Sequence, residues 1–418
     1  MEYLIKNAII VDAKSDHHLQ KRDILIENGI ITNIDSTIKV SDKSKVIELV
    51  NLHVSAGWFD SSISFGEPGF EERETIANGL KTAAYSGFTD IILNTNTNPV
   101  PDNKGAIRFI KSNGDKAATS IHPAGTFTQS ADGEHLAELF DMSQDGAVSF
   151  FDYKKPIKNP NLLKIGLQYT QRFDAIVQSF PLEASISPKG IVNEHINSTQ
   201  LGLKGVPSLS ETLQISRDLA ILEYSGGRLH IPTISTSKSV ALIRDAKKNG
   251  LNVTCSVAAH NLYLTDDELH SFDTSYKLTP PLRTKEDIKA LIKGVKDGTI
   301  DMVTSDHNPI DVENKNLEFD HASYGSIGLE SCFGTILSKL DLETAINALT
   351  KQSQFNLKSS GVEKGSIASL TLFNPSIEWT FSTSDILSTS HNAAMLGKKL
   401  TGRAYGIFNN KKLALHKL

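Results

Sequence analysis

Eight short apolar runs recur through the middle of this chain, and their spacing limits the possible folds more than any other feature. The runs span 58–65, 89–93, 117–121, 147–151, 173–180, 228–234, 252–257 and 301–304. Most are separated by segments with helical periodicity, such as 211–224, 239–248 and 285–296, each followed within two residues by a glycine. Alternating strands and helices predict βα units with right-handed crossovers and a parallel sheet. Eight units that close on themselves form a (β/α)₈ TIM barrel, and an open doubly wound sheet is the alternative.

Both ends of the chain have a different, β-rich pattern. Strands are predicted at 3–11, 23–27, 29–34, 369–373, 402–408 and 412–415. Asn28-Gly29 is a hairpin-turn signal between two of the N-terminal strands. We therefore expect segments 1–52 and 363–418 to build one small composite β-sheet domain beside a barrel that spans 53–362.

The charge and cysteine content exclude several classes of protein. The chain has 43 basic and 48 acidic residues and a net charge of −5, whereas a nucleic-acid binder normally shows a basic surplus. Two cysteines, Cys255 and Cys332, are too few for a disulfide framework or a Cys₄ metal site. No apolar run approaches the roughly 20 residues that span a bilayer, and the N-terminal stretch lacks signal-peptide character. We expect a cytoplasmic protein that binds neither nucleic acid nor membrane.

The polar residues at the ends of the predicted strands are the candidate site, because barrel enzymes place their chemistry at the C-terminal ends of the strands. These residues are Ser62, Ser64, Asn96, Asp152, Gln178, Thr233, His260, Asp306 and His307. Hydroxyl, amide and carboxylate groups dominate this set, which contains only two imidazoles.

The segment Gly57–Gly69, GWFDSSISFGEPG, resembles the first-strand signature GFIDxHxHLREPG of bacterial dihydroorotases, which belong to the amidohydrolase superfamily. Further matches follow in the same order at 96–100, 205–208, 235–240, 280–283, 297–301, 305–309 and 328–330. These matches cover nearly the whole chain, so the resemblance does not rest on one motif. It implies a barrel of the metal-dependent hydrolase type, flanked by a composite sheet from both termini.

The resemblance implies an activity, the reversible hydrolysis of the dihydroorotate ring amide to carbamoyl aspartate in pyrimidine synthesis. The family uses zinc for this reaction because water is a poor nucleophile at neutral pH. A bound Zn²⁺ lowers the pKa of its water from about 15.7 toward 7 and polarises the carbonyl group. Imidazoles and carboxylates hold such an ion and leave one position open for the water.

Most zinc ligands of the family are missing from this chain. The four histidine positions, two on the first strand and one at the end of strands five and six, fall on Ser62, Ser64, Gln178 and Thr233. Asp306 matches the eighth-strand carboxylate, a ligand and proton-transfer base, and we interpret it as a catalytic remnant. Asp152 lies near the fourth-strand acidic ligand and is the other remaining candidate, although its register stays open. We expect no metal cofactor; zinc is expected only if the chain is active.

The substrate contacts of the family are also reduced. The arginine that would hold the substrate carboxylate falls on Gly66, and two further contacts fall on Thr279 and Ile310. Losing the arginine removes a bidentate donor for a carboxylate. The remnants of the substrate site are Asn96, Tyr324 and Gly325.

Other polar residues have ordinary structural interpretations. His307 and His230 are predicted to pack inside the barrel. Relatives use a carbamylated lysine near strand four, but the pair Lys154-Lys155 lies beyond the aligned position and next to Pro156, so it is predicted to lie in a solvated loop. His260 is a conceivable replacement ligand beside Asp306, but two ligands do not make a tetrahedral zinc site.

Three hypotheses about function follow. Some members of the dihydroorotase family lack the zinc ligands and associate with aspartate transcarbamoylase as structural subunits, so the resemblance favours a pseudoenzyme with a scaffold or assembly role and that partner. The alternative is an active dihydroorotase, or a related cyclic amide hydrolase, with an unrecognised metal site. In the third hypothesis the emptied pocket binds a small molecule as a sensor. A homodimer is expected because dimers are the commonest symmetric assembly.

Overall fold

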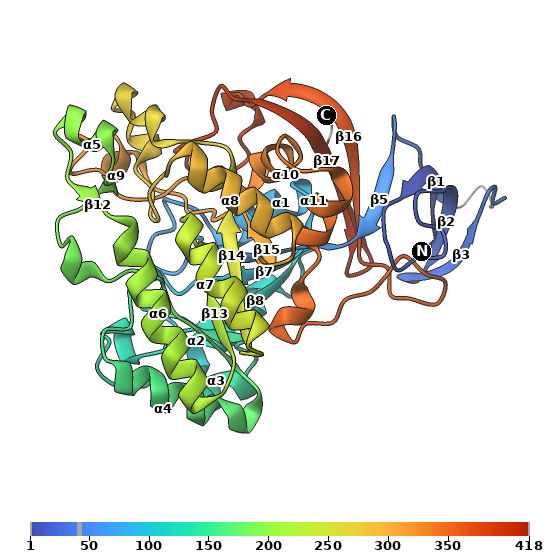
Figure 1. Cartoon of the computed structure of the whole chain (residues 1–418). Coiled ribbons are helices and arrows are strands. Elements are labelled where there is room, and N and C mark those ends of the chain that lie inside the picture. The colour runs from blue at the N-terminus through green and yellow to red at the C-terminus, as the bar shows by residue number, and fades with distance from the viewer. Residues whose placement is uncertain (1, 40–43, 417–418) are drawn as a thin grey trace.

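Eight parallel strands form a barrel at the centre of the molecule (Figure 1), in a computed structural model that describes residues 2–39 and 44–416. The strands are β6 (Trp58–Ile63), β7 (Phe88–Leu93), β8 (Ser120–Gly125), β9 (Ser149–Phe150), β10 (Ile176–Gln178), β13 (Leu229–Ile231), β14 (Val253–Ala258) and β15 (Met302–Thr304). Each pairs with its neighbours in chain order, and a parallel bridge between Ile63 and His307 joins the first and last strands. The eight predicted strands are confirmed, and the open doubly wound sheet is excluded.

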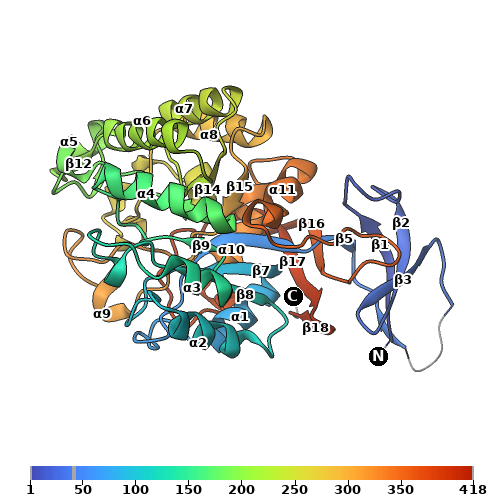
Figure 2. The same cartoon turned by 90° about the horizontal axis from the view of Figure 1, so that it is seen from below.

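Helices cover the outside of the barrel, as Figure 2 shows from below. They are α1 (Ile76–Tyr85), α2 (Lys104–Gly114), α3 (Leu139–Gln144), α4 (Pro160–Thr170), α6 (Ser208–Ser225), α7 (Ser237–Lys248), α8 (Lys285–Lys296), α10 (Leu329–Leu337) and α11 (Leu342–Leu349). Two short helices, α5 (Ile196–Leu201) and α9 (Val312–Lys315), lie apart from this layer. Side-chain caps fix several starts: Thr75 caps α1, Thr236 caps α7, and Thr284 forms a capping box with Asp287 on α8. Within residues 2–39 and 44–416, no helix has the length and apolar character needed to cross a bilayer.

The two ends of the chain meet in a second sheet beside the barrel. Its strands are β1 (Glu2–Ile10), β2 (Lys21–Glu27), β3 (Ile30–Asp35), β4 (Lys45–Ile47), β5 (His53–Ala56), β16 (Leu370–Thr380), β17 (Lys399–Asn409) and β18 (Lys412–Leu415). The order is β18-β17-β16-β5-β1-β2-β3, with β4 paired to β1, so β5 connects the N-terminal strands to the C-terminal ones. The predicted composite sheet is present, with β4 and β5 added. A smaller pair, β11 (Val192–Asn193) and β12 (Gly205–Val206), lies outside both sheets.

A buried aromatic cluster joins the barrel to the second sheet. The Trp58 ring, at the start of β6, is fully buried, and its centroid lies 4.5 Å from that of Phe333 and 5.4 Å from that of Phe373. Phe333 belongs to α10 and Phe373 to β16, so one indole contacts the barrel, a covering helix and the terminal sheet. The indole Nε1 also donates to Ser55 Oγ on β5 at 3.0 Å, which satisfies its buried polar group.

Candidate functional site

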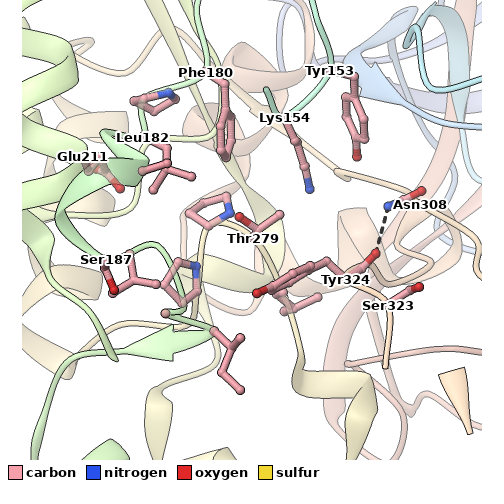
Figure 3. A pocket seen from close by; sticks show the side chains of 18 of the residues that line it. Tyr153, Lys154, Phe180, Leu182, Ser187, Glu211, Thr279, Asn308, Ser323 and Tyr324 are labelled. Carbon is pink, nitrogen blue, oxygen red and sulfur yellow. Dashed lines mark hydrogen bonds between the residues drawn. The ribbon is translucent and has the colours of Figure 1, made fainter. Parts of the chain in front are cut away.

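A cavity of about 460 Å³ lies at the C-terminal ends of the barrel strands (Figure 3). Residues that follow four different strands line it: Asn96 after β7, Lys154 after β9, Phe180 after β10 and Asn308 after β15. The rest of the wall includes Arg73, Tyr153, Glu211, Thr279, Arg283, Ile310 and Tyr324. The cavity therefore lies on the face of the barrel where the sequence places the candidate site.

A chain of hydroxyl and amide groups occupies the ends of β6, β7 and β15. Asn94 Nδ2 donates to Ser62 Oγ at 3.2 Å and to Ser64 Oγ at 3.1 Å. Ser64 Oγ then donates to Asn96 Oδ1 at 2.8 Å, and Asn96 Nδ2 contacts Asn308 Oδ1 at 3.5 Å. The two positions that match the first-strand histidines are thus integrated into a neutral hydrogen-bond network.

Asp306, at the end of β15, forms an ion pair with a lysine. Lys154 Nζ lies 2.8 Å from Asp306 Oδ2, and their side chains are 11% and 3% exposed. Ser62 Oγ approaches the other carboxylate oxygen, Oδ1, at 3.4 Å. Burial alone would lower the pKa of Lys154, but the Asp306 carboxylate and Tyr153 hold it above its ordinary value. The ammonium group therefore stays charged at neutral pH.

The prediction that Lys154 lies in a solvated loop is wrong. Its side chain points into the cavity beside Tyr153, and its ammonium group lies 5.2 Å from the centre of the Tyr153 ring (Figure 3). The backbone at Lys154 has φ of +53°, a left-handed conformation that side-chain-bearing residues adopt uncommonly. Lys155 is exposed and donates to the Ala131 carbonyl oxygen at 3.0 Å, so the solvated interpretation fits Lys155 alone.

Asp152, the other remaining metal-ligand candidate, has both carboxylate oxygens engaged in loop structure. Its Oδ1 accepts from the backbone N–H groups of Phe127 at 2.9 Å and Thr128 at 3.1 Å. Its Oδ2 accepts from Thr128 Oγ1 at 2.6 Å. Burial raises the pKa of Asp152, and the hydrogen bonds from Thr128 and Phe127 partly offset that rise. This carboxylate organises the loop after β8.

The two remaining lost ligand positions are buried among barrel strands. Gln178 Nε2 donates to Ser149 Oγ at 2.8 Å, which links β10 to β9. The backbone N–H of Thr233 donates to Ser256 Oγ at 3.1 Å. Gln178 has an amide and Thr233 a hydroxyl side chain, so neither position offers a metal ion an imidazole or a carboxylate.

His260 follows β14 and is almost fully buried. Burial lowers its pKa to about 4, with a raising effect from Asp306 and a lowering effect from Lys154. Its imidazole is therefore neutral at physiological pH. Among the residues that the structure describes, its Nε2 has no hydrogen-bond partner.

His307 and His230 pack inside the barrel, as predicted. His307 Nδ1 accepts from the backbone N–H groups of Gly328 at 3.1 Å and Leu329 at 3.4 Å, at the start of α10. The ring nitrogens of His230 contact Thr254 Oγ1 at 2.9 Å and the Ser256 hydroxyl at 3.3 Å. Burial lowers the pKa of His307 to about 4 and that of His230 to about 3, so both rings are neutral.

These residues do not fit a zinc ion. In residues 2–39 and 44–416, no group of three or more His, Cys, Asp or Glu side chains is arranged to hold a metal. Tetrahedral zinc sites need three or four imidazole, thiolate or carboxylate ligands, whereas serine hydroxyls and an amide stand at the matching positions here. The single retained carboxylate, Asp306, is already paired with the Lys154 ammonium group.

The lost substrate arginine has no direct replacement, but a different arginine lines the cavity. A Cβ atom at Gly66 would lie 1.6 Å from the carbonyl oxygen of Phe70, so this backbone excludes any side chain there. Arg73 lies in the same loop, with its guanidinium 4.4 Å from the centre of the Phe70 ring. Its Nε donates to Asp311 Oδ2 at 2.8 Å. Arg73 could not be predicted from the sequence, because no motif position corresponds to it.

A buried ion pair forms another wall of the cavity. The Glu211 carboxylate on α6 accepts from the backbone N–H groups of Ser235 at 2.9 Å and Thr236 at 3.0 Å, and from Ser239 Oγ at 2.6 Å. Arg283 Nη2 lies 3.8 Å from Glu211 Oε2, and both side chains are at most 3% exposed. The pair holds α6, the start of α7 and the loop before α8 together.

The loop with Tyr324 and Gly325 is held by a buried lysine. Lys315 Nζ donates to the carbonyl oxygens of Ser323 at 2.9 Å and Gly325 at 2.8 Å. Asn308 Nδ2 donates to the carbonyl oxygen of Tyr324 at 3.3 Å. Gly325 has φ of +140°, and a Cβ there would meet Asn308 Nδ2 at 2.6 Å, so this position requires glycine.

Stability is expected to depend on pH through Lys315. Burial and the nearby charge of Lys277 lower the pKa of Lys315 to about 7. The unfolded chain, with an ordinary lysine pKa of about 10.4, then holds a proton that the folded chain lacks between pH 7 and 10. The free energy of unfolding should therefore rise with pH in that window, by up to about 1.4 kcal/mol per unit from this group.

Urea unfolding at pH 7, 8 and 9 measures this effect as the difference between wild type and Lys315→Met. The control is Lys285→Met, since the Lys285 side chain is 72% exposed. Its difference from wild type should stay constant with pH. The prediction would be contradicted if the difference in free energy of unfolding between wild type and Lys315→Met also stayed constant between pH 7 and 9.

Comparison with known proteins places the chain in a family. Residues 49–239 match the family model described as "Dihydro-orotase-like". The chain is 36% identical over 410 residues to a protein named dihydroorotase from Pelotomaculum thermopropionicum, and the match covers 96% of each chain. It is 34% identical over 415 residues to a dihydroorotase from Trichlorobacter lovleyi, with 97% of each chain covered.

Solved structures agree at the level of the fold. The L-hydantoinase (dihydropyrimidinase) from Arthrobacter aurescens superposes with a TM-score of 0.83 at 20% identity, covering 99% of this chain and 97% of that one. The D-hydantoinase from a Thermus species gives a TM-score of 0.80 at 20% identity, with 99% and 95% covered. The fold is therefore that of the amidohydrolase barrels, and the identity to the curated relatives over nearly the full length shows that the chain belongs to the dihydroorotase family.

Proposed function

We propose that this chain is a non-catalytic member of the dihydroorotase family with a structural or assembly role in pyrimidine synthesis. The proposed partner is aspartate transcarbamoylase, the proposed self-assembly is a homodimer, and the proposed location is the cytoplasm. One observation supports the loss of catalysis above all others. At the barrel mouth, Ser62 and Ser64 replace two imidazoles and accept hydrogen bonds from Asn94, while the retained carboxylate of Asp306 is paired with the Lys154 ammonium group.

This arrangement lacks a means of activating water. Free water has a pKa of about 15.7, and a bound metal ion lowers that value toward 7. Asp306 would have to act as a general base, but it is hydrogen-bonded to an ammonium group at 2.8 Å. This contact occupies one oxygen of the carboxylate, and among the described residues no three His, Cys, Asp or Glu side chains are arranged to hold a metal ion that would activate water instead.

Metal analysis and a hydrolysis assay test the loss of catalysis. Protein purified without chelator is expected to contain less than about 0.1 zinc per chain, because four imidazole ligands are replaced. Hydrolysis of dihydroorotate should not exceed the rate without protein. The relative from Pelotomaculum thermopropionicum, whose name states the activity, serves as the positive control. One or more zinc ions per chain, together with turnover, would overturn the proposal.

The proposed partner is tested by size-exclusion chromatography of the purified chain with aspartate transcarbamoylase from the same organism. Co-elution ahead of either protein alone is expected at micromolar concentrations, since specific interfaces bury about 1,200–2,000 Å². Separate elution at these concentrations would remove aspartate transcarbamoylase as the partner. The elution volume of the chain alone reports whether it is a dimer.

The second candidate function is an active cyclic amide hydrolase, either a dihydroorotase or a relative. The observation in its favour is that curated relatives at 34–36% identity over nearly the full chain are named dihydroorotase. This candidate requires metal ligands other than the four replaced histidines. The same zinc measurement decides between the two candidates.

A further inference from the structure

We infer that the ammonium group of Lys154 is a built-in cation that occupies the metal position of this barrel and keeps divalent ions out. The inference goes beyond the loss of imidazoles, because it assigns a role to a residue that the family resemblance does not. It concerns the geometry around Asp306, the one retained carboxylate of the family site.

The first support is the position of the ammonium group. Lys154 Nζ lies 2.8 Å from Asp306 Oδ2, and Ser62 Oγ lies 3.4 Å from Oδ1 of the same carboxylate. Ser62 matches a family ligand position, so the ammonium group and the hydroxyl of a replaced ligand each contact one oxygen of the retained carboxylate. A metal ion could bind this carboxylate only by displacing the charge-assisted hydrogen bond at Oδ2 or the hydroxyl contact at Oδ1.

The second support is charge compensation. Asp306 is 3% exposed, and a buried carboxylate is costly unless it is paired and hydrogen-bonded. In the family a divalent cation compensates the charge of this carboxylate, whereas here the single positive charge of Lys154 compensates it and gives a neutral pair. A divalent ion placed beside this pair would meet an ammonium group at close range, and the resulting repulsion opposes binding.

The third support is the way in which the lysine is held. Lys154 adopts a left-handed backbone conformation at φ +53°, which aims its side chain into the cavity instead of toward solvent (Figure 3). The ring of Tyr153 lies 5.2 Å from its ammonium group. Uncommon backbone conformations of this kind persist where the surrounding contacts fix them. The adjacent Lys155 has neither the conformation nor the partner, and it provides a matched control.

The experiment restores the first-strand imidazoles and asks whether Lys154 prevents zinc from binding. Three chains are compared by equilibrium dialysis against zinc: Ser62→His/Ser64→His, the same chain with Lys154→Met, and the same chain with Lys155→Met. Methionine has a length similar to lysine without its charge. Zinc is expected to bind at least tenfold more tightly to the Lys154→Met chain than to the other two. Equal zinc affinity in all three chains would overturn the inference.

A second measurement uses the site without added histidines, in case the histidine variants do not fold by circular dichroism. Lys154→Met should lower the melting temperature, and adding Asp306→Asn should recover at least half of that loss, because the carboxylate no longer lacks a partner. Lys155→Met, which removes one hydrogen bond to the Ala131 carbonyl oxygen, should lower the melting temperature by less than Lys154→Met. The inference would be overturned if the double variant lost as much melting temperature as the two single variants, Lys154→Met and Asp306→Asn, lose together. The zinc content of the wild type is measured separately, so failure here is distinguishable from failure of the proposed function.

Discussion

Replacing Glu211 by alanine is expected to lower the free energy of unfolding by about 3–5 kcal/mol, because it leaves a buried charge without a partner. The guanidinium of Arg283 lies 3.8 Å from Glu211 and is 3% exposed. Its hydrogen-bond acceptors are neutral: Asn193 Oδ1 and the Val206 carbonyl oxygen, each at 2.8 Å, and Ser235 Oγ at 3.1 Å. The substitution would also leave the donors of Ser235 and Thr236 unsatisfied, which adds to the cost.

Urea unfolding followed by circular dichroism measures this loss. The control is Lys285→Ala, which breaks an exposed ion pair with Asp267 at 3.3 Å. Exposed pairs contribute little, so the control should lose less than about 1 kcal/mol. A loss below about 1.5 kcal/mol for Glu211→Ala would show that the Glu211–Arg283 pair does not hold this wall of the cavity.

Replacing Trp58 by alanine is expected to cost a similar amount, about 3–5 kcal/mol, because it opens a cavity among aromatic rings. The indole is fully buried, and its ring centre lies 4.5 Å from Phe333, 5.4 Å from Phe373 and 6.1 Å from Phe88. Since these rings come from a helix, the terminal sheet and the next barrel strand, the loss should affect the whole molecule. Separate unfolding steps for the barrel and the terminal sheet are therefore not expected in the wild type.

The matched control for this prediction is Tyr224→Ala, which removes an aromatic ring that is 80% exposed on α6. It should change the free energy of unfolding by less than about 0.5 kcal/mol. Trp58→Phe should lie between the two, because it keeps most of the apolar contact but loses the hydrogen bond to Ser55. A wild-type-like stability for Trp58→Ala would contradict the view that this ring joins the two parts of the fold.

Most helices and strands could be predicted from the sequence because apolar periodicity and helix-ending glycines are local features of the chain. Helix α8 was predicted at 285–296 and lies at Lys285–Lys296, since its apolar period and the glycine after it are both visible in the chain. Strands β4 and β5, with three and four residues, were missed. Runs this short show no alternation long enough to distinguish a strand from a loop.

The contents of the site depend on contacts that no local pattern records. The sequence predicts a solvated loop at Lys154 because the Lys154-Lys155 pair lies beyond the aligned ligand position and next to Pro156. Its direction is decided by Asp306, 152 residues later in the chain, and by the backbone conformation at position 154. The role of Asp152 could not be predicted either, because its hydrogen-bond partners are backbone groups of the loop after β8, which no local sequence pattern identifies. The sequence identified which imidazoles are missing but not which group took their place.

The pairing of β5 with β16 has a consequence for biogenesis. Residues 53–56 align antiparallel to residues 370–373, so this edge of β5 stays open until residues 370–373 have left the ribosome. The barrel strands between them finish emerging before that edge is covered. A truncation that removes β16 would expose the β5 edge as a template for intermolecular pairing, so a nonsense mutation near residue 369 should yield aggregates rather than a shorter working protein.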